Sequence, residues 1–414
     1  MHIEVIEWSR FKSSLAYPSI PSEPKLDPFI KAVAVTGVGL ESSGDCSILV
    51  ISRVPRKVNA DEPWLSRVRE AIKYTIENDW IIVSSVGNLG WDYITWYAAR
   101  SGATVWLALP PQSVNELNQT CADLSRRLKL DVGRTSFLIP ITLQKLLKTD
   151  NQQLRDKLAL SLAGHRLPIY IRPGGNWSSS MVGITGVDRQ FSASRPRTNI
   201  ESWRNIKEEL IKSSEGDWGD LLIHWTRGTY GAWRGEVDAD YFEALTEATS
   251  GNPRDALATL EFIAASGILR GEGRMIKDST PVISFSDLPP SAALKQIEFR
   301  PTLGRWSYEP CGITFPRKLL EKLGARRVIY GDKEFYEQLS TADKPYYQYH
   351  GNTVKEAMKH NWTRESEWRI TGDIDLLSLK DQVFLITPTE MEADRLRRSL
   401  PYRVVSLERG LSVV

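Results

Sequence analysis

The sequence predicts an α/β protein of two domains, a doubly wound sheet followed by an α+β domain with a mixed sheet. Residues 31 to about 190 alternate apolar strand candidates with amphipathic helices, whereas residues 221–330 hold several short strands and one long helix. A polar stretch near 190–215 separates the two regions. A chain of 414 residues is also long for one hydrophobic core, so we expect domains at 1–195 and 215–414.

The first region has the pattern of a parallel sheet covered by helices on both faces. Its strand candidates are apolar runs at 32–38, 47–52, 80–84, 104–109, 136–139 and 168–172. Between them, residues 62–78 and 91–101 space their apolar side chains three and four apart, as a helix with one buried stripe does. Apolar strands that alternate with such helices are typical of a Rossmann-like sheet.

Two turns at strand ends in this region could approach a ligand. Ser52 and Arg53 end one strand, and Gly87, Gly90 and Asp92 lie between the next strand and its helix. Glycines let backbone N–H groups come close to an anion, and a helix start adds a partial positive charge. Such turns also occur as plain tight turns, so both interpretations stay open.

The second region begins with a strand at 221–226. A helix follows at 256–269, where Gly267 suits the helix C-terminus, and further strands are expected at 282–286, 312–315 and 328–330. These strands alternate or run apolar in the way of a mixed, partly antiparallel sheet.

Polar side chains recur on or after these apolar strands. They are His224, Thr226, Ser284, Ser286, Glu365 and Glu367. A buried polar group is costly unless it is hydrogen-bonded, so their recurrence predicts a shared polar site. Alternatives are a core histidine, an edge strand with hydrated serines, and a solvated strand face on which the glutamates pair with Arg364 and Arg369.

The order of segments in the first region resembles the SLOG superfamily, the Rossmann-like domains typified by the DNA-processing protein A and cytokinin-activating families. The matching segments are 48–53, 84–92, 154–157 and 171–175. The resemblance implies that Ser52, Arg53, Gly87, Gly90 and Asp92 bind or sense a nucleotide. The alternative is a scaffold that has lost its ligand.

The second region resembles the ADP-ribosyltransferase fold, most closely in bacterial toxin and abortive-infection families. The resemblance is carried by His-Trp-Thr at 224–226, Ser-Gly-Ile-Leu at 266–269, Ser-Phe-Ser at 284–286 and Trp-x-x-Glu-x-Glu-Trp-Arg at 362–369. It implies that NAD is the substrate, that Glu367 is the catalytic carboxylate and that Glu365 polarises the acceptor. The residues implied to hold NAD are His224, Thr226, Arg227, Ser284 and Ser286.

Together the two resemblances imply a bacterial effector in phage defence or toxin action. Its second domain would transfer ADP-ribose to a protein or nucleic-acid target or hydrolyse NAD, gated by the first domain, and a neutralising partner is a further expectation. The rival interpretation is a non-catalytic DNA- or nucleotide-binding protein that acts through the first domain. Its basic contacts would be Arg53, Arg56, Lys57, Arg126, Arg127 and Arg155.

Composition and short motifs exclude several other classes of protein. The net charge of +2 gives no strong overall attraction to nucleic acid, and no apolar run has the length of a membrane helix. Three widely spaced cysteines and the absence of a secretory pattern predict a cytoplasmic protein with reduced thiols. No metal site is expected, because His350 and His360 have no Cys or carboxylate at ligand spacing. Ser-His-Asp hydrolysis is not expected either, because no Gly-x-Ser-x-Gly motif follows a strand.

Overall fold

The computed structural model describes residues 3–7, 9–11, 30–37, 45–142, 148–196, 204–274, 276–300, 305–349 and 366–410. The chain forms two compact units. The first comprises Met1–Asn199 and Tyr230–Pro253, and the second comprises Ile200–Thr229 and Arg254–Val414. The sequence alone assigned everything after residue 215 to the second domain, whereas the structure groups Tyr230–Pro253 with the first unit.

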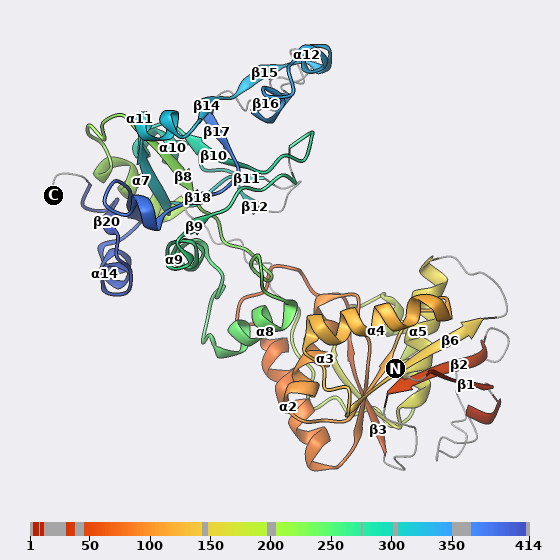
Figure 1. Cartoon of the computed structure of the whole chain (residues 1–414). Coiled ribbons are helices and arrows are strands. Elements are labelled where there is room, and N and C mark those ends of the chain that lie inside the picture. Colours follow the sequence, from red (N-terminus) through yellow and green to blue (C-terminus); the bar gives the residue numbers. More distant parts are fainter. Residues whose placement is uncertain are drawn as a thin grey trace. The chain divides into compact units, whose positions relative to one another are not determined.

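The first unit is built on a seven-stranded mixed sheet in the order β1-β2-β6-β5-β4-β3-β7 (Figure 1). Its strands are β1 (Ile3–Glu7), β2 (Ile30–Gly37), β3 (Cys46–Ile51), β4 (Ile81–Ser84), β5 (Val105–Ala108), β6 (Thr135–Thr142) and β7 (His165–Tyr170). The five strands from β6 to β7 pair in parallel, but the β1–β2 and β2–β6 pairs are antiparallel. The expected fully parallel sheet is therefore mixed, because an apolar run reveals burial and not strand direction.

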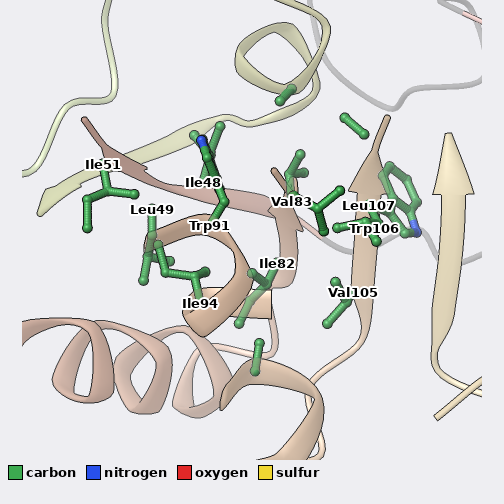
Figure 2. Packing of buried hydrophobic residues seen from close by; sticks show 14 of the residues in the cluster. Ile48, Leu49, Ile51, Ile82, Val83, Trp91, Ile94, Val105, Trp106 and Leu107 are labelled. Carbon is green, nitrogen blue, oxygen red and sulfur yellow. The ribbon is translucent and has the colours of Figure 1, made fainter. Parts of the chain in front are cut away.

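Helices cover both faces of this sheet. They include α2 (Pro63–Glu77), α3 (Leu89–Arg100), α4 (Val114–Leu128), α5 (Lys148–Leu162) and the short α6 (Asn176–Ser180). Every residue of β3, β4 and β5 is buried, which requires cover on both sides. Figure 2 shows Trp91 and Ile94 of α3 beside Ile48, Leu49 and Ile82 of the strands.

Helix α8 (Asp238–Glu247) completes the first unit although it follows the first strand of the second. It buries Ala239, Tyr241, Phe242 and Leu245. The Phe242 ring lies 5.6 Å from the rings of both Tyr93 and Trp96 on α3. Three ion pairs flank this apolar contact, namely Arg100–Glu243, Arg127–Asp238 and Lys129–Asp240. An apolar face framed by charges explains why the segment folds onto this unit.

The second unit contains a seven-stranded sheet in the order β14-β17-β10-β8-β13-β19-β20 (Figure 1). Its strands are β8 (Leu221–Trp225), β10 (Val282–Ser286), β13 (Gly312–Pro316), β14 (Arg326–Arg327), β17 (Glu367–Thr371), β19 (Phe384–Thr387) and β20 (Arg403–Ser406). All neighbouring pairs are antiparallel except β19 and β20, which are joined by helix α14 (Glu390–Ser399). The expected mixed sheet is present.

The other described elements of this unit lie outside the seven-stranded sheet. The helices are α7 (Arg204–Ser213), α9 (Ala256–Ser266), α10 (Pro290–Lys295), α11 (Arg317–Lys322), α12 (Lys333–Gln338), η1 (Lys344–Tyr346) and η3 (Leu377–Leu379). Two-stranded sheets pair β9 (Ile268–Leu269) with β18 (Ile374–Asp375), β11 (Phe299–Arg300) with β12 (Arg305–Trp306), and β15 (Ile329–Gly331) with β16 (Tyr347–Tyr349). The expected strand at 328–330 is thus β15, outside the main sheet.

Gly267 ends α9 as the sequence predicted. Its φ of +70° is left-handed, and a Cβ there would lie 2.6 Å from the Leu377 side chain. Glycine is therefore required both for the backbone turn and for the close approach.

Strand alternation sorts the side chains of β10 and β17. Ile283, Phe285, Trp368 and Ile370 all belong to one hydrophobic cluster. The intervening residues, Ser284, Ser286, Glu367 and Arg369, point to the other face of the sheet.

Three general predictions concern the cysteines, membrane spans and metal sites. Cys46, Cys121 and Cys311 are all buried free thiols, as expected. Within the described ranges, no helix combines the length and apolarity that crossing a bilayer requires. The same ranges contain no metal-type grouping of three His, Cys, Asp or Glu side chains, and His350 and His360 lie outside them.

Candidate functional site

Three neighbouring strands of the second sheet carry the candidate residues His224, Ser284 and Glu367. These strands, β8, β10 and β17, lie side by side. Across β10 and β17, Ser286 is directly opposite Glu367, and Ser284 is opposite Arg369. Directly opposed residues share a face, so the register gathers these four polar side chains.

The Glu367 carboxylate is held by two partners. Its Oε1 accepts hydrogen bonds from Ser284 Oγ at 2.6 Å and from Arg369 Nε at 2.9 Å, and its Oε2 accepts one from Arg369 Nη2 at 3.1 Å. The side chain of Glu367 is 12% exposed and that of Arg369 is 4% exposed. The pairing with Arg369 that the sequence left open is present, and both of its side chains are largely buried, although the adjoining Ser284 is exposed.

Arg369 is itself fixed by the segment that contains η1 and β16. Its Nη1 donates to the carbonyls of Tyr347 at 2.8 Å and Pro345 at 3.3 Å, and its Nη2 donates to Gln348 Oε1 at 2.7 Å. A guanidinium bonded through all three nitrogens has little rotational freedom. It therefore sets the orientation of the Glu367 carboxylate.

His224 joins this group through the backbone of β10. Strands β8 and β10 share a single registered pair, Ser286 with Ile223. Beyond that pair, the carbonyl of Ser284 accepts a hydrogen bond from the Nδ1 of His224 at 2.9 Å. The imidazole thus links the two strands at the point where their backbone pairing ends.

The environment of His224 keeps its ring neutral at physiological pH. Burial lowers the pKa of His224 to about 4; the hydrogen bond to Ser284 opposes this effect, and the charge of Arg227 adds to it. A carbonyl can only accept, so the ring hydrogen lies on Nδ1 and leaves Nε2 as an acceptor.

The other predicted residues of this region have structural partners. The buried Thr226 hydroxyl lies within hydrogen-bond distance of the carbonyls of Ala256 and Cys311, at 3.1 and 3.0 Å. Ser286 Oγ accepts from the N–H of Leu288 at 3.2 Å. Arg227 Nη1 donates to the Ser307 carbonyl at 3.2 Å. The structure therefore joins the side chains of Ser284 and Glu367, whereas His224 bonds only the backbone of Ser284. Strand alternation places the His224 ring on the other face of the sheet, 6.0 Å from the Phe285 ring. Thr226 ties β8 to its neighbours.

Two residues that the sequence singled out lie outside the part of the chain that the structure describes, and two residues of the site were not predicted. Glu365 and Trp362 fall outside the described residues. Gln348 and Asp287 were not predicted, although Gln348 holds Arg369 and Asp287 contacts Trp368, the residue after Glu367. The only sequence signal for Asp287 was an acidic residue directly after a strand.

In the first unit, the predicted residues gather at the carboxyl ends of parallel strands. Strand β3 lies between β4 and β7, so the chain order reverses at β3, and such a switch point is where open α/β sheets bind ligands. The N–H of Ser52 donates to the Tyr170 carbonyl at 2.7 Å, and Ser52 Oγ accepts from the N–H of Arg172 at 2.9 Å. Arg53 and Arg172 are exposed at these ends, and neither side chain has an ion pair or hydrogen bond with any described residue.

The glycine turn after β4 is shaped by its two glycines. Gly87 has a φ of +103°, and its N–H donates to Asp92 Oδ1 at 3.0 Å. A Cβ on Gly90 would lie 3.0 Å from Ile51 Cδ1, so glycine lets α3 approach β3 closely. Arg155 also stabilises the turn, because its Nη1 donates a hydrogen bond to the Val86 carbonyl at 2.9 Å.

Asp92 and two arginines of the rival interpretation are engaged inside the first unit. Burial raises the pKa of Asp92 to about 6, whereas the N–H of Gly87 and the charge of Arg127 oppose the rise. Arg127 is paired with Asp238, and the largely buried Arg155 is paired with Asp156 at 2.6 Å. These two cations therefore act within the fold, whereas Arg53, Arg56 and Arg126 are exposed.

Comparison with known proteins finds no matching family model, curated protein or solved structure for this chain. The geometry of the two sites is the basis for a functional assignment.

Proposed function

We propose that the second unit binds NAD and breaks the bond between nicotinamide and ribose, as an ADP-ribosyltransferase or NAD glycohydrolase. The observation that carries this proposal is the hydrogen bond of 2.6 Å from Ser284 to Glu367, which joins two residues 83 positions apart on neighbouring strands. It holds a largely buried carboxylate beside a hydroxyl, and the backbone carbonyl of the same serine binds the neutral imidazole of His224.

The chemistry explains why these groups belong together. When the ribose C1′–nitrogen bond breaks, its electron pair leaves with nicotinamide, and positive charge develops on the ribose. The Glu367 carboxylate stabilises that charge, while Ser284 and Arg369 hold it in place before the reaction. Its Oε2 accepts only from Arg369 among the described residues and has a further lone pair for a ribose hydroxyl.

His224 supplies a second contact to the substrate in this proposal. With the hydrogen on Nδ1 committed to Ser284, its Nε2 accepts a hydrogen bond from a ribose hydroxyl. Water or a nucleophile of a macromolecular acceptor then bonds to C1′ and loses its proton. This role for His224 is positional, so its loss affects binding and geometry together.

The test is nicotinamide release by the purified full-length chain supplied with NAD, alone and with DNA, RNA or cell lysate. Glu367→Gln keeps the shape and hydrogen-bonding capacity but removes the charge, so we expect turnover to fall at least a hundredfold. Glu321→Gln, an identical change at an exposed position on α11, is the matched control. Turnover that survives Glu367→Gln would overturn the catalytic assignment.

A second function is favoured by the switch point of the first unit. We propose that an anionic nucleotide binds between the ends of β3 and β7 and gates the second unit in a bacterial effector. Support comes from Arg53 and Arg172, which are exposed and have no side-chain partner among the described residues, together with the glycine turn at Gly87. Calorimetric titration with nucleotides separates the two functions, because binding that is lost in Arg53→Ala but kept in Glu367→Gln belongs to the first unit.

A further inference from the structure

The turn that enters β17 has an unusual backbone. Ser366, directly before Glu367, has a φ of +47°, in the left-handed region that residues other than glycine seldom adopt. Holding a serine there strains the backbone and requires surrounding contacts. The direction in which Glu367 leaves this turn depends on that conformation.

Asp287 supplies those contacts from the neighbouring strand end. It directly follows Ser286, the residue opposite Glu367. Its backbone N–H donates to the Ser366 carbonyl at 3.3 Å, and its Oδ2 accepts from Trp368 Nε1 at 3.2 Å. One residue thus binds both sequence neighbours of Glu367.

The Asp287 carboxylate is held in place by two arginines. Its side chain is 8% exposed, with Arg327 Nη2 at 2.7 Å and Arg317 Nη1 at 3.5 Å from Oδ2. The same guanidiniums lie over the Trp368 ring, at 5.1 Å for Arg317 and 5.6 Å for Arg327. Burial alone would raise the pKa of Asp287, but hydrogen bonds from Ser366 and Trp368 and the charges of both arginines lower it below its ordinary value. A charged Asp287 therefore fixes the Trp368 indole on one side of the strand while Ser284 holds Glu367 on the other.

We infer that Asp287 is a positioning residue for Glu367. It clamps Ser366 and Trp368 and thereby sets the direction of the carboxylate between them. The inference rests on the proposed NAD-cleaving function for its catalytic consequence, but the clamp itself can be measured without NAD.

The test uses the full-length chain with Asp287→Asn and Ser366→Gly. Asp287→Asn keeps the shape and one acceptor but loses the charge, so we expect kcat for nicotinamide release to fall at least tenfold with KM for NAD within twofold. Ser366→Gly accepts the positive φ without strain and removes the hydroxyl, so kcat should fall severalfold while the melting temperature stays level or rises. Asp394→Asn, which breaks a solvent-exposed Asp–Arg pair on α14, is the control for charge loss.

Hydrogen exchange of the backbone amides of residues 366–371 measures how firmly Asp287 holds this segment. Asp287→Asn should speed exchange of these amides at least tenfold, whereas Asp394→Asn should not. A wild-type chain that never releases nicotinamide would defeat the proposed function and leave this exchange measurement to decide on the clamp. Unchanged exchange in Asp287→Asn and Ser366→Gly would overturn the inference. So would a kcat within twofold of wild type in an active enzyme. If Asp287→Asn fails to fold, the measurements on Ser366→Gly decide.

Discussion

The two sheets of this protein place their candidate residues in different ways. In the first unit, Ser52, Arg53 and Gly87 lie on turns after the strands, and the Arg53 side chain is exposed there. In the second, Ser284 and Glu367 lie within strands, and the register between β10 and β17 brings them together. A site on turns tolerates shifts of the scaffold, whereas a site made by register is lost when one strand slips by a single residue.

The largest expected effect concerns the ion pair of the second sheet. Arg369→Met leaves the Glu367 carboxylate shielded and unpaired, so we expect the free energy of unfolding to fall by about 3–5 kcal/mol. Arg326→Met is the matched control, because Arg326 lies opposite Arg369 in the register of β14 and β17. Its ion pair with Asp343 is half exposed, so its loss should cost less than about 1 kcal/mol. Urea unfolding compares the two variants, and equal losses would contradict this account.

The pH dependence of the second unit follows from His224. Its pKa is about 4 in the folded chain against 6.5 as the ordinary value, so the unfolded chain binds more protons between these limits. Stability present above pH 6.5 is therefore lost as the pH falls toward 4, by about 3 kcal/mol at most. Relative to wild type, His224→Gln should gain stability as the pH falls through this window, and a pH-independent difference would argue against a half-buried neutral ring.

The first unit should respond to acid in the opposite direction. The pKa of Asp92 is raised from 3.8 to about 6, so the folded chain binds more protons between these values. At pH 7.5 the buried charge is a cost that Asp92→Asn removes, and we expect a gain of about 2–3 kcal/mol that vanishes below pH 4. The amide keeps an acceptor for the N–H of Gly87. Urea unfolding at both pH values checks this, and a destabilised variant at pH 7.5 would show that the charge is needed for the fold.

Gly90 tests the close approach of helix and strand. Gly90→Ala places a Cβ about 3.0 Å from Ile51, and overpacking of this kind costs about 1–3 kcal/mol. Gly324→Ala has an open surrounding but a φ of +101°, so it isolates the cost of backbone strain. Hydrogen exchange in α3 should rise only in the Gly90 variant.

Arg53 should give the smallest change in stability. Its side chain is exposed and makes no contact that holds the fold, so Arg53→Ala should change the free energy of unfolding by less than about 0.5 kcal/mol. Its effect should appear in anion binding, where the slope of log affinity against log salt drops by about one. A large loss of stability would show that Arg53 belongs to the scaffold.

Strands β2 to β7 of the first sheet and β8, β10 and β13 of the second were predicted because their residues are buried in continuous or alternating runs, whereas β1, β19 and β20 were not predicted. The direction of β2 was not predictable, since burial is the same for a parallel and an antiparallel strand. The edge strand β14 was missed because Arg326 and Arg327 are exposed and have no apolar pattern. Residue types thus indicated where strands lie, and long-range pairing decided how they run.

The residues of the candidate site were also only partly predictable from the sequence. His224, Ser284 and Glu367 stand out as polar residues in or beside apolar strands; the side chains of Ser284 and Glu367 are in contact, and His224 bonds the backbone of Ser284. The partners Gln348 and Asp287 are distant in sequence from Arg369 and Trp368, and nothing local marks them. The hydroxyl of Thr226 is bonded to backbone carbonyls, a fate that its position on the strand cannot reveal.

Helix α8 limits how the protein can be divided for experiments. A fragment starting near residue 200 or 215 would include this helix without the surface that covers Tyr241, Phe242 and Leu245. Those apolar side chains would face water and favour self-association. An isolated second unit is better made by replacing residues 230–253 with a short linker between Thr229 and Arg254, whose backbones already form a hydrogen bond of 2.8 Å.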